Sequence, residues 1–450
     1  MSVAVPYPRA RRWLVIWLAT LNVGILGIAL ALGLTLNRRA LWLAALVPIA
    51  IVPFSYARLR LDLLLQQSLA RLPRVFAVVA GLGVALDFVL VAQLLTRGSD
   101  RLALLQGTGI NWAGPVWFSA HALLFLGYAA LGLVRLLRRP ARALWRLVVP
   151  PASDDLAGGL VSPERRLLLQ RAGLVGAGVP FFVSLSSVPL SYDLRVEERE
   201  LELPNLPPEL DGLRVAHLSD IHVGGVMTRE RLLRMAELVN ASEPDLVAHT
   251  GDFLTHRSGD FDAPLYDALA LIRAPYGQWA CLGNHDFDDP ERFERKLTAA
   301  GVHVLRNRAE RIEVRGVPIE IVGADFLFAR ERREEIYARL MSSFPERDGT
   351  LRIFLNHDPR AFLEIPESCA DLVLSGHTHG GHVGVQVTRD RAITLVGLVG
   401  IPDQGVFERG DMRMFVTRCV GYYGYPMRVG IPPEIALLVL RAPGARTTRT

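Results

Sequence analysis

Four short motifs follow one another through the second half of the chain, and each comes directly after a short apolar run. The motifs are Asp220-Ile221-His222, Gly251-Asp252, Gly283-Asn284-His285-Asp286 and Gly376-His377-Thr378-His379. A single His357 lies between the third and the fourth. Because short apolar runs bounded by turn residues are typical of buried strands, each motif is expected in a loop at a strand end. In α/β sheets such loops form ligand sites, so the motifs are predicted to meet at one site.

The side chains in these motifs are of the kinds that bind transition metals. Mixed nitrogen and oxygen donors suit manganese, iron, zinc or cobalt, and the sequence does not choose among them. A two-metal centre needs one carboxylate that bridges both ions, and Asp252 is the natural bridge because the preceding glycine allows close approach of the backbone. We therefore predict two divalent metal ions, held by Asp220, His222, Asp252, Asn284, His357, His377 and His379.

The two residues that follow Asn284 are predicted to act in catalysis. His285 would face the leaving-group oxygen as a general acid or charge stabiliser, and Asp286 would orient its ring. A pair of cations can hold a hydroxide and neutralise the charge that develops when a phosphate ester is attacked. Each motif alone is common, but four in this order, each after a strand, favour metal-dependent hydrolysis of a phosphate ester.

With these motifs the chain resembles the calcineurin-like metallophosphoesterase superfamily. Residues 218–222 and 375–381 are similar to its bacterial membrane-associated or exported branch, and transmembrane proteins with a metallophosphoesterase domain are similar in layout. The resemblance covers about residues 195–442 and implies a four-layer αββα fold. It also implies that His285 is the catalytic histidine. In the implied ligand sets, one ion is bound by Asp220, His222, Asp252 and His379, and the other by Asp252, Asn284, His357 and His377.

Several positions near the motifs depart from the family pattern or have an open role. Thr255 and His256 stand where this branch often carries an acid, which puts one supporting contact of the ligands in doubt. His382 replaces a usual glutamine, so the substrate mouth is expected to differ. Arg428, in a segment that resembles a family loop near the site, would either bind substrate phosphate or lie on the surface.

Other histidines and the cysteines are expected to have structural roles. His217 and His249 lie in predicted strands and are expected to support the ligands rather than bind metal. The three cysteines form no CxxC pair and are expected to be small buried side chains; they are Cys281, Cys369 and Cys419.

The first 193 residues differ from the rest of the chain in charge. They carry 19 arginines and 7 acidic residues, whereas residues 194–450 carry 31 basic and 38 acidic residues. The basic excess lies beside long apolar runs, which is typical of a membrane protein. The second half shows no basic patch with interleaved aromatic residues, so nucleic-acid binding is not expected.

Five apolar segments in the first half are predicted to cross a membrane, and they are residues 13–36, 41–56, 75–95, 112–134 and 172–190. Arginine-rich loops, such as the predicted second loop with Arg58, Arg60, Arg71 and Arg74, alternate with arginine-poor ones. This predicts a cytoplasmic N-terminus at the inner (cell) membrane. Five crossings place the second half outside the cytoplasm. If the glycine-diluted fifth segment does not span, the second half is cytoplasmic instead. Arg165-Arg166 also resembles a twin-arginine export signal, although an ordinary cytoplasmic flank is preferred.

Asp87 lies inside the third predicted span, and none of the predicted spans contains a cationic residue that could pair with it. It is expected to face the interior of the helix bundle and to hydrogen-bond there. A role in proton or ion transfer is the less favoured alternative.

The fold class is therefore an N-terminal α-helical membrane bundle plus an α/β soluble domain. The predicted boundaries are a membrane domain at 1–193, a polar linker at 194–212, a catalytic domain at 213–442 and a tail at 443–450. Strands alternate with helices early in the catalytic domain and dominate later. This pattern predicts two sheets packed face to face, with helices outside.

The sequence predicts a membrane-anchored hydrolase acting on a phosphomonoester, phosphodiester or pyrophosphate. A site tethered near the bilayer favours a lipid-linked substrate. UDP-diacylglucosamine is the candidate that the resemblance implies, because some relatives of the resembled family are associated with its hydrolysis. The alternatives are a non-catalytic metal-binding scaffold or signalling protein, and a transporter-like role for the membrane half. No ligand is missing, which disfavours the first, and the spans contain few charges, which disfavours the second. The oligomeric state is not predicted.

Overall fold

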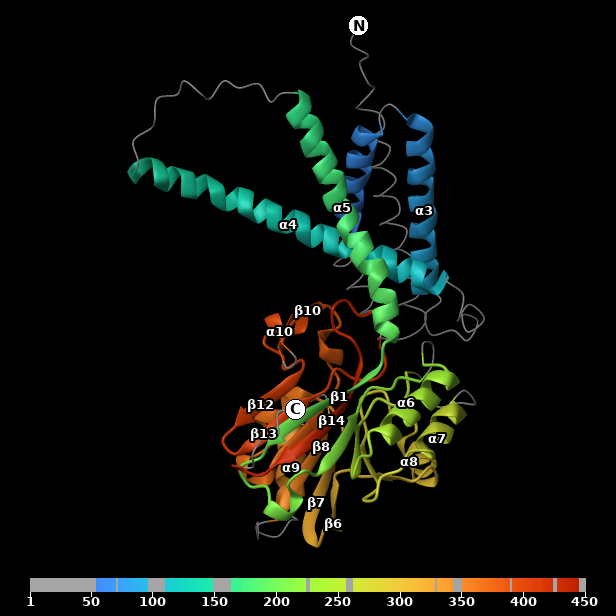
Figure 1. Ribbon diagram of the computed structural model, residues 1–450, viewed down its shortest axis with the longest axis vertical. Coiled ribbons are helices and arrows are strands. Elements are labelled where there is room, and N and C mark those ends of the chain that lie inside the picture. The colour runs from blue at the N-terminus through green and yellow to red at the C-terminus, as the bar shows by residue number, and fades with distance from the viewer. Residues whose placement is uncertain are drawn as a thin grey trace. The chain divides into compact units, whose positions relative to one another are not determined.

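The chain forms two compact units, Met1–Ser186 and Ser187–Thr450 (Figure 1). The structure is a computed structural model, which describes residues 54–69, 72–95, 110–148, 163–223, 227–255, 262–327, 330–342, 350–388, 391–423 and 427–444. The first predicted span, 13–36, and most of the second, 41–56, lie outside the described residues.

The described part of the first unit is helical. Residues 54–68 form one helix, which is followed by α3 (Pro73–Leu95), α4 (Ile110–Val148) and α5 (Pro163–Tyr192). Within α4 and α5, the stretches Val116–Arg138 and Leu167–Tyr192 are long and apolar enough to cross a membrane. They contain most of the fourth predicted span and all of the fifth, and the glycines of the fifth do not interrupt the helix.

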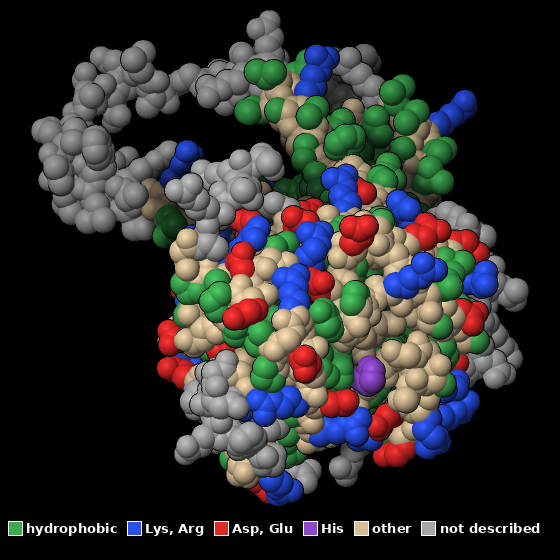
Figure 2. Space-filling model, turned by 60° about the horizontal axis from the view of Figure 1, so that its bottom comes forward, with side chains coloured by type: hydrophobic (Ala, Val, Ile, Leu, Met, Phe, Trp, Pro, Cys, Tyr) green, Lys and Arg blue, Asp and Glu red, His purple; other side chains and the backbone are tan. Residues whose placement is uncertain are grey.

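The surfaces of these helices expose large apolar side chains. Val175, Phe182 and Leu136 are 70%, 73% and 65% exposed, and Figure 2 shows such hydrophobic side chains on the helices of the N-terminal unit. Helices that are apolar towards their surroundings suit contact with lipid, where all backbone polar groups are satisfied within the helix.

Two expectations for the first unit are wrong. Arg58 and Arg60, which were counted towards a loop, lie within the helix of residues 54–68, and Arg58 is buried. Asp87 does have a cationic partner, because Arg58 Nη1 lies 3.5 Å from Asp87 Oδ2. The helix continues past Tyr56 because apolar residues recur between the charges.

The second unit contains two six-stranded mixed sheets. In spatial order the first sheet comprises β1 (Arg195–Glu202), β14 (Glu434–Arg441), β2 (Arg214–Leu218), β3 (Leu246–Thr250), β4 (Gln278–Cys281) and β5 (Val302–Val304). The second comprises β12 (Gly405–Arg409), β13 (Met412–Val416), β9 (Leu372–Ser375), β8 (Leu351–Asn356), β7 (Val317–Ala324) and β6 (Arg308–Val314). A separate hairpin joins β10 (Gly384–Thr388) to β11 (Arg391–Thr394) and leads into the short α10 (Leu395–Leu398).

Three apolar cores join four layers. The middle core lies between the two sheets and includes Val215, Ile321 and Leu355. On the outer face of the first sheet pack α6 (Arg229–Ala241), α7 (Ala263–Leu269) and α8 (Pro290–Ala299). On the outer face of the second sheet pack α9 (Arg330–Ser342) and the 3₁₀ helix η4 (Pro359–Leu363). The predicted four-layer αββα arrangement is confirmed (Figure 1).

The central strands are buried on both faces, as parallel strands covered on both sides must be. Every residue of β3 and of β8 is buried, which explains why they appear in the sequence as largely apolar runs. The segment at 194–212 is predicted to be a linker, but it contains β1, which pairs in parallel with β14. This edge strand is rich in charged residues, which protect a sheet edge from pairing with other chains. Because of these charges, the strand shows no run or alternation of apolar residues by which the sequence could reveal it.

A buried ion pair network joins β1, β14 and the segment after β13. Glu434 Oε2 lies 2.8 Å from Arg199 Nη2 and 2.6 Å from Arg418 Nη2, and the backbone N–H of Arg418 donates to Glu434 Oε1. Burial alone would raise the pKa of Glu434, but the two guanidinium groups hold it below its usual value.

We expect Glu434→Gln to lower the free energy of unfolding by about 3 kcal/mol, because two buried guanidinium groups lose their counter-charge. All three cysteines of the chain are buried in this unit, so their labelling by a thiol reagent in rising denaturant measures its unfolding in the intact protein. Since the folded pKa of Glu434 is depressed, the stabilisation is present at neutral pH and lost as the pH falls through that pKa. The variant should therefore lose less stability than the wild type on acidification.

The matched control is Glu313→Gln, on the exposed face of β6, which should change the unfolding free energy little. Equal cysteine protection in Glu434→Gln and in the wild type at neutral pH would contradict the structural importance of the network.

Candidate metal centre

The four motifs and His357 follow five strands of the two sheets. They come after β2, β3, β4, β9 and β8, at the carboxyl ends of strands that run parallel within each sheet. Glycines allow these loops to touch. A Cβ at Gly283 would lie 2.2 Å from Asp252 Oδ1, and one at Gly376 would lie 1.9 Å from Ser219 Oγ. The glycines of the motifs are thus required by close approach of neighbouring loops.

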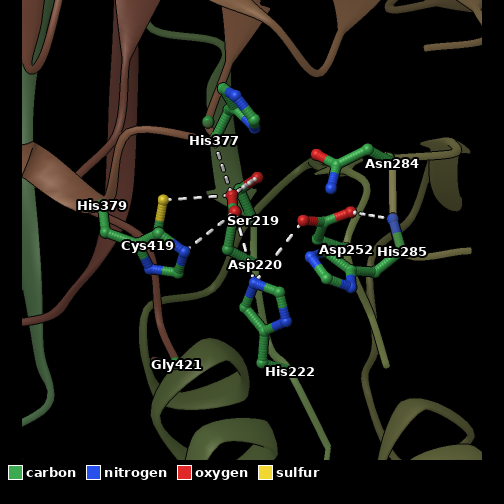
Figure 3. A network of polar contacts seen from close by, with 12 residues as sticks. Ser219, Asp220, His222, Asp252, Asn284, His285, His377, His379, Cys419 and Gly421 are labelled. Carbon is green, nitrogen blue, oxygen red and sulfur yellow. Dashed lines mark hydrogen bonds and ion pairs between the residues drawn. The ribbon is translucent and has the colours of Figure 1, made fainter. Parts of the chain in front are cut away.

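One group of donor atoms surrounds the carboxylate of Asp220 (Figure 3). His379 Nε2 lies 3.2 Å and His222 Nε2 3.6 Å from Asp220 Oδ1. The other oxygen, Oδ2, accepts hydrogen bonds from Ser219 Oγ, from the backbone N–H of His377 and from Cys419 Sγ, at 2.5, 2.8 and 3.1 Å. Three donors therefore fix one oxygen of Asp220 and leave the other facing two imidazole nitrogens.

Asp252 lies between this group and a second one. Its Oδ2 is 3.5 Å from His222 Nε2 and 3.3 Å from His357 Nε2, and its Oδ1 accepts the backbone N–H of His285 at 2.8 Å. In the second group His357 Nε2 lies 3.1 Å from Asn284 Oδ1 and 3.0 Å from His377 Nδ1. Asp252 is the one carboxylate shared by both groups.

The donor atoms fit a pair of metal ions. The groups Asp220–His222–Asp252 and Asp252–His357–His377 each place three ligand atoms within 4.8 Å of one another. Among the described residues, Asp220 Oδ1 and His222 Nε2 are buried and lack a hydrogen-bond partner, although buried polar atoms normally have one. In the second group, ring nitrogens and an amide oxygen face one another at about hydrogen-bond distance. A metal ion could accept a lone pair from each of these atoms at once.

Charges in the cluster shift the pKa values of its members. Burial would raise the pKa of Asp220, but nearby histidines, first His379 and then His357, hold it well below its usual value. Burial would lower the pKa of His357, but the carboxylates of Asp252 and Asp220 raise it to about 10. The pKa of Asp252 is also lowered, because His357 offsets the effect of burial. Both carboxylates are therefore ionised at neutral pH, the state that metal binding requires, and a metal ion bound by His357 would take the place of the proton that this histidine otherwise holds.

His285 lies at the edge of the cluster, and its ring packs on other aromatic rings. The ring centroids of Tyr423 and His222 lie 4.1 and 5.2 Å from that of His285, and Tyr423 also stacks on His222 at 5.0 Å. Tyr423 is 43% exposed, so it forms part of the site's outer wall. Tyr423 belongs to the same segment as Arg428, which resembles a family loop near the site, but no role for this ring is predicted from the sequence.

Asp286 does not orient the His285 ring as predicted. Its carboxylate accepts backbone N–H groups of Asp252, Phe253 and Gly283 at 2.7, 3.0 and 2.9 Å. Burial, and after it the charge of Asp252, raises the pKa of Asp286 to about 7. Asp286 therefore ties the loop of Asp252 to the loop of Asn284.

Arg428 neither binds phosphate at an open site nor lies on the surface. It is 0% exposed, and its guanidinium donates to four backbone carbonyls, those of His379, Arg418, Cys419 and Gly421. Tyr422 lies 5.4 Å from the guanidinium, measured to its ring centroid. Arg428 thus joins the loop of His379, which lies 49 residues earlier in the sequence, to the segment after β13.

The other residues discussed from sequence have supporting roles. His217 and His249 are buried and lie 2.9 and 3.2 Å from Thr250 Oγ1 and Gln278 Oε1. Thr255 Oγ1 donates a hydrogen bond to the carbonyl of His222 at 2.9 Å. A polar side chain therefore supports this loop at the position where the family often has an acid. His256 lies outside the described residues. The ring of His382 lies 4.8 Å from that of His379.

Comparison with known proteins points to one family. The family model of calcineurin-like phosphoesterases matches residues 213–381, which contain all nine candidate site residues. An uncharacterised metallophosphoesterase of Aquifex aeolicus is 30% identical, over 56% of this chain and 94% of that protein. The uncharacterised metallophosphoesterase YkuE of Bacillus subtilis is 28% identical, over 55% and 86%. A transmembrane protein with metallophosphoesterase domain of Danio rerio is 32% identical, over 55% and 57%.

We expect Arg428→Met to weaken Mn²⁺ binding by about 10- to 100-fold, because supports of metal ligands typically contribute that much to affinity. Four carbonyls would lose their donor, and the His379 loop would lose its tie to the segment after β13. Titration of the intact protein with Mn²⁺, followed by the electron paramagnetic resonance signal of the free ion, measures the change.

Arg234→Met is the matched control, because this side chain is 64% exposed on α6. Equal Mn²⁺ affinities in the two variants would show that Arg428 has no part in positioning the ligand loop.

Proposed function

The chain belongs to the calcineurin-like metallophosphoesterases, and from this premise we propose that its α/β unit hydrolyses a phosphate ester with two divalent metal ions. One observation carries the proposal. The carboxylate oxygen Oδ2 of Asp252 lies between His222 and His357, at 3.5 and 3.3 Å, where a ligand common to two ions belongs.

The proposed ligand sets follow the two donor groups. Asp220, His222 and His379 would hold one ion and Asn284, His357 and His377 the other, with Asp252 shared. Bound there, the ions would supply Lewis acidity and neutralise negative charge on a phosphate ester. The nitrogen and oxygen donors suit manganese, iron, zinc or cobalt.

His285 is proposed to donate a hydrogen bond or proton to the leaving-group oxygen. Its backbone N–H is held by Asp252 Oδ1, which ties the position of this histidine to the shared carboxylate. Its ring is held between Tyr423 and His222. Burial lowers the pKa of His285, and the neutral ring carries one N–H that can donate a hydrogen bond to the leaving-group oxygen. Donation of the proton itself would need the imidazolium form. Asp286 is proposed as a positioning residue, because it binds the backbone of both loops that flank the site.

The substrate is proposed to be lipid-linked, with UDP-diacylglucosamine as the leading candidate. The apolar stretch of α5 ends at Tyr192 and β1 begins at Arg195, so a very short tether would join a membrane span to the hydrolase. The relative from Danio rerio is named a transmembrane protein. We place the N-terminus in the cytoplasm and the α/β unit outside it, at the inner membrane, because eight arginines lie between residues 135 and 171, just before the last predicted span.

We expect His285→Gln to lower the Mn²⁺-dependent hydrolysis of bis-p-nitrophenyl phosphate by about 100-fold or more, the usual effect of losing a group that stabilises or protonates the leaving oxygen. Asp252→Asn should lower it further and reduce the number of bound ions, because both ligand sets lose their shared carboxylate. The assay uses the full-length protein in detergent, with His303→Gln and Asp267→Asn as matched exposed controls.

Undiminished turnover in His285→Gln or Asp252→Asn would refute the roles assigned to them. Metal binding without turnover of any ester would favour the scaffold alternative. Hydrolysis of the soluble diester, but never of a phospholipid or nucleotide-lipid, would refute the lipid-linked substrate alone.

We expect a cysteine introduced by Glu209→Cys, at an exposed position before β2, to react with a membrane-impermeant maleimide in cells whose inner membrane is intact. The three native cysteines are buried, so the wild-type protein serves as the background control. Labelling only after lysis would place the hydrolase in the cytoplasm.

A further inference from the structure

The N-terminal unit contains three charged side chains that are buried among its helices. Arg58 and Asp62 lie on the helix of residues 54–68, and Asp87 lies on α3; they are 2%, 4% and 1% exposed. Arg58 Nε donates to Asp62 Oδ2 at 2.9 Å, and Arg58 Nη1 lies 3.5 Å from Asp87 Oδ2. One guanidinium thus serves two carboxylates.

Side chains of α4 complete the surroundings of Asp87. Trp117 Nε1 donates to Asp87 Oδ1 at 2.7 Å, and the Arg58 guanidinium lies 5.2 Å from the centroid of the Trp117 ring. Asp87 Oδ2 accepts no hydrogen bond from any residue that the structure describes. That oxygen is buried and directed at the cluster, and it retains the capacity to carry a proton.

His121 is the remaining titratable group that faces the cluster among the described residues. Its Nδ1 lies 2.8 Å from the carbonyl of Trp117, and its ring packs against Trp117, Phe54 and Phe181 at centroid distances of 4.3, 4.6 and 5.3 Å. Phe181 is the contact from α5. An aromatic surrounding of this kind favours the uncharged ring, so His121 does not offset the charge of the carboxylates.

The backbone of α3 is shaped to admit the guanidinium. A Cβ at Gly83 would lie 2.4 Å from Arg58 Nη1 and Nη2, so a larger residue there would displace the arginine. The cluster is therefore a built feature of three helices, with a glycine that makes room for its cation, rather than a chance approach of flexible side chains.

The charges within the described part of this cluster do not balance. Two ionised carboxylates and one guanidinium leave one uncompensated negative charge among apolar helices. A buried group in that position takes up a proton in preference to remaining charged. Asp62 makes the shorter contact with Arg58, so Asp62 is the better stabilised anion and Asp87 the better acceptor of the proton.

We propose that Arg58, Asp62 and Asp87 form a proton-binding site within the membrane helices, in which Asp87 carries the proton. The positive guanidinium and the small number of oxygens make the site unsuited to a metal cation. This site is separate from the hydrolase centre, and it gives the membrane half a function beyond anchoring. Ionisable residues within membrane helices commonly mark such functions.

A hydrophobic carbodiimide tests the proposal, because it reacts with protonated carboxyl groups in apolar surroundings. We expect the full-length protein in detergent to be labelled at Asp87, as located by mass spectrometry, and the labelling to fall as the pH is raised. Asp87→Asn should reduce labelling of the first unit to background. Asp193→Asn is the matched control, since this side chain is 38% exposed, and it should leave labelling unchanged.

Arg58→Gln provides a second, opposite signature. Loss of the guanidinium removes the charge that favours ionised carboxylates, so labelling should persist to higher pH than in the wild type. The wild-type experiment alone decides the case if a variant does not fold. Absence of label from Asp62 and Asp87 at every pH at which the protein stays folded would overturn the proposal, and protection by Na⁺ at constant pH would assign the site to a metal cation instead.

Discussion

The contact between the loop of Asp252 and the loop of Asn284 is the constraint on which the site depends. Asp252 Oδ1 binds the backbone of His285, and the Asp286 carboxylate accepts hydrogen bonds from the backbone of Asp252 and Gly283. The two loops therefore hold each other. Because a Cβ at Gly283 would lie 2.2 Å from Asp252, no other residue fits without moving the shared carboxylate.

The same loops store backbone strain where the candidate ligands lie. Five of these residues have φ between 51° and 68°, in the left-handed region that residues other than glycine rarely adopt; they are Asp220, His222, Asp252, His377 and His379. Such conformations cost roughly 1–3 kcal/mol each and persist only when their surroundings enforce them. Asp286 and Arg428 supply part of that enforcement, since each binds the backbone of loops that carry ligands. The folded sheets thus hold these loops in strained conformations that fix the positions of the donor atoms.

The sequence predicted the metal cluster and the layered fold because both follow from local patterns. A motif after an apolar run identifies a strand end, and parallel strands bring their ends together. Contacts between distant segments that carry no motif were not predictable. The charged strand β1 is recognisable only beside β14, and Arg428 only beside the carbonyls of the His379 loop. Likewise the sequence assigns Arg58 to a loop, and only the fold shows that it contacts Asp87 of α3 and Trp117 of α4.

The central claim is that Asp252 is shared by two metal ions, and anomalous diffraction from crystals of the Mn²⁺-loaded protein tests it most directly. If Asp252 is shared, two peaks are expected, one on the side of His222 and one on the side of His357, with the carboxylate of Asp252 between them. A single peak, or two peaks that leave Asp252 without an ion, would contradict it.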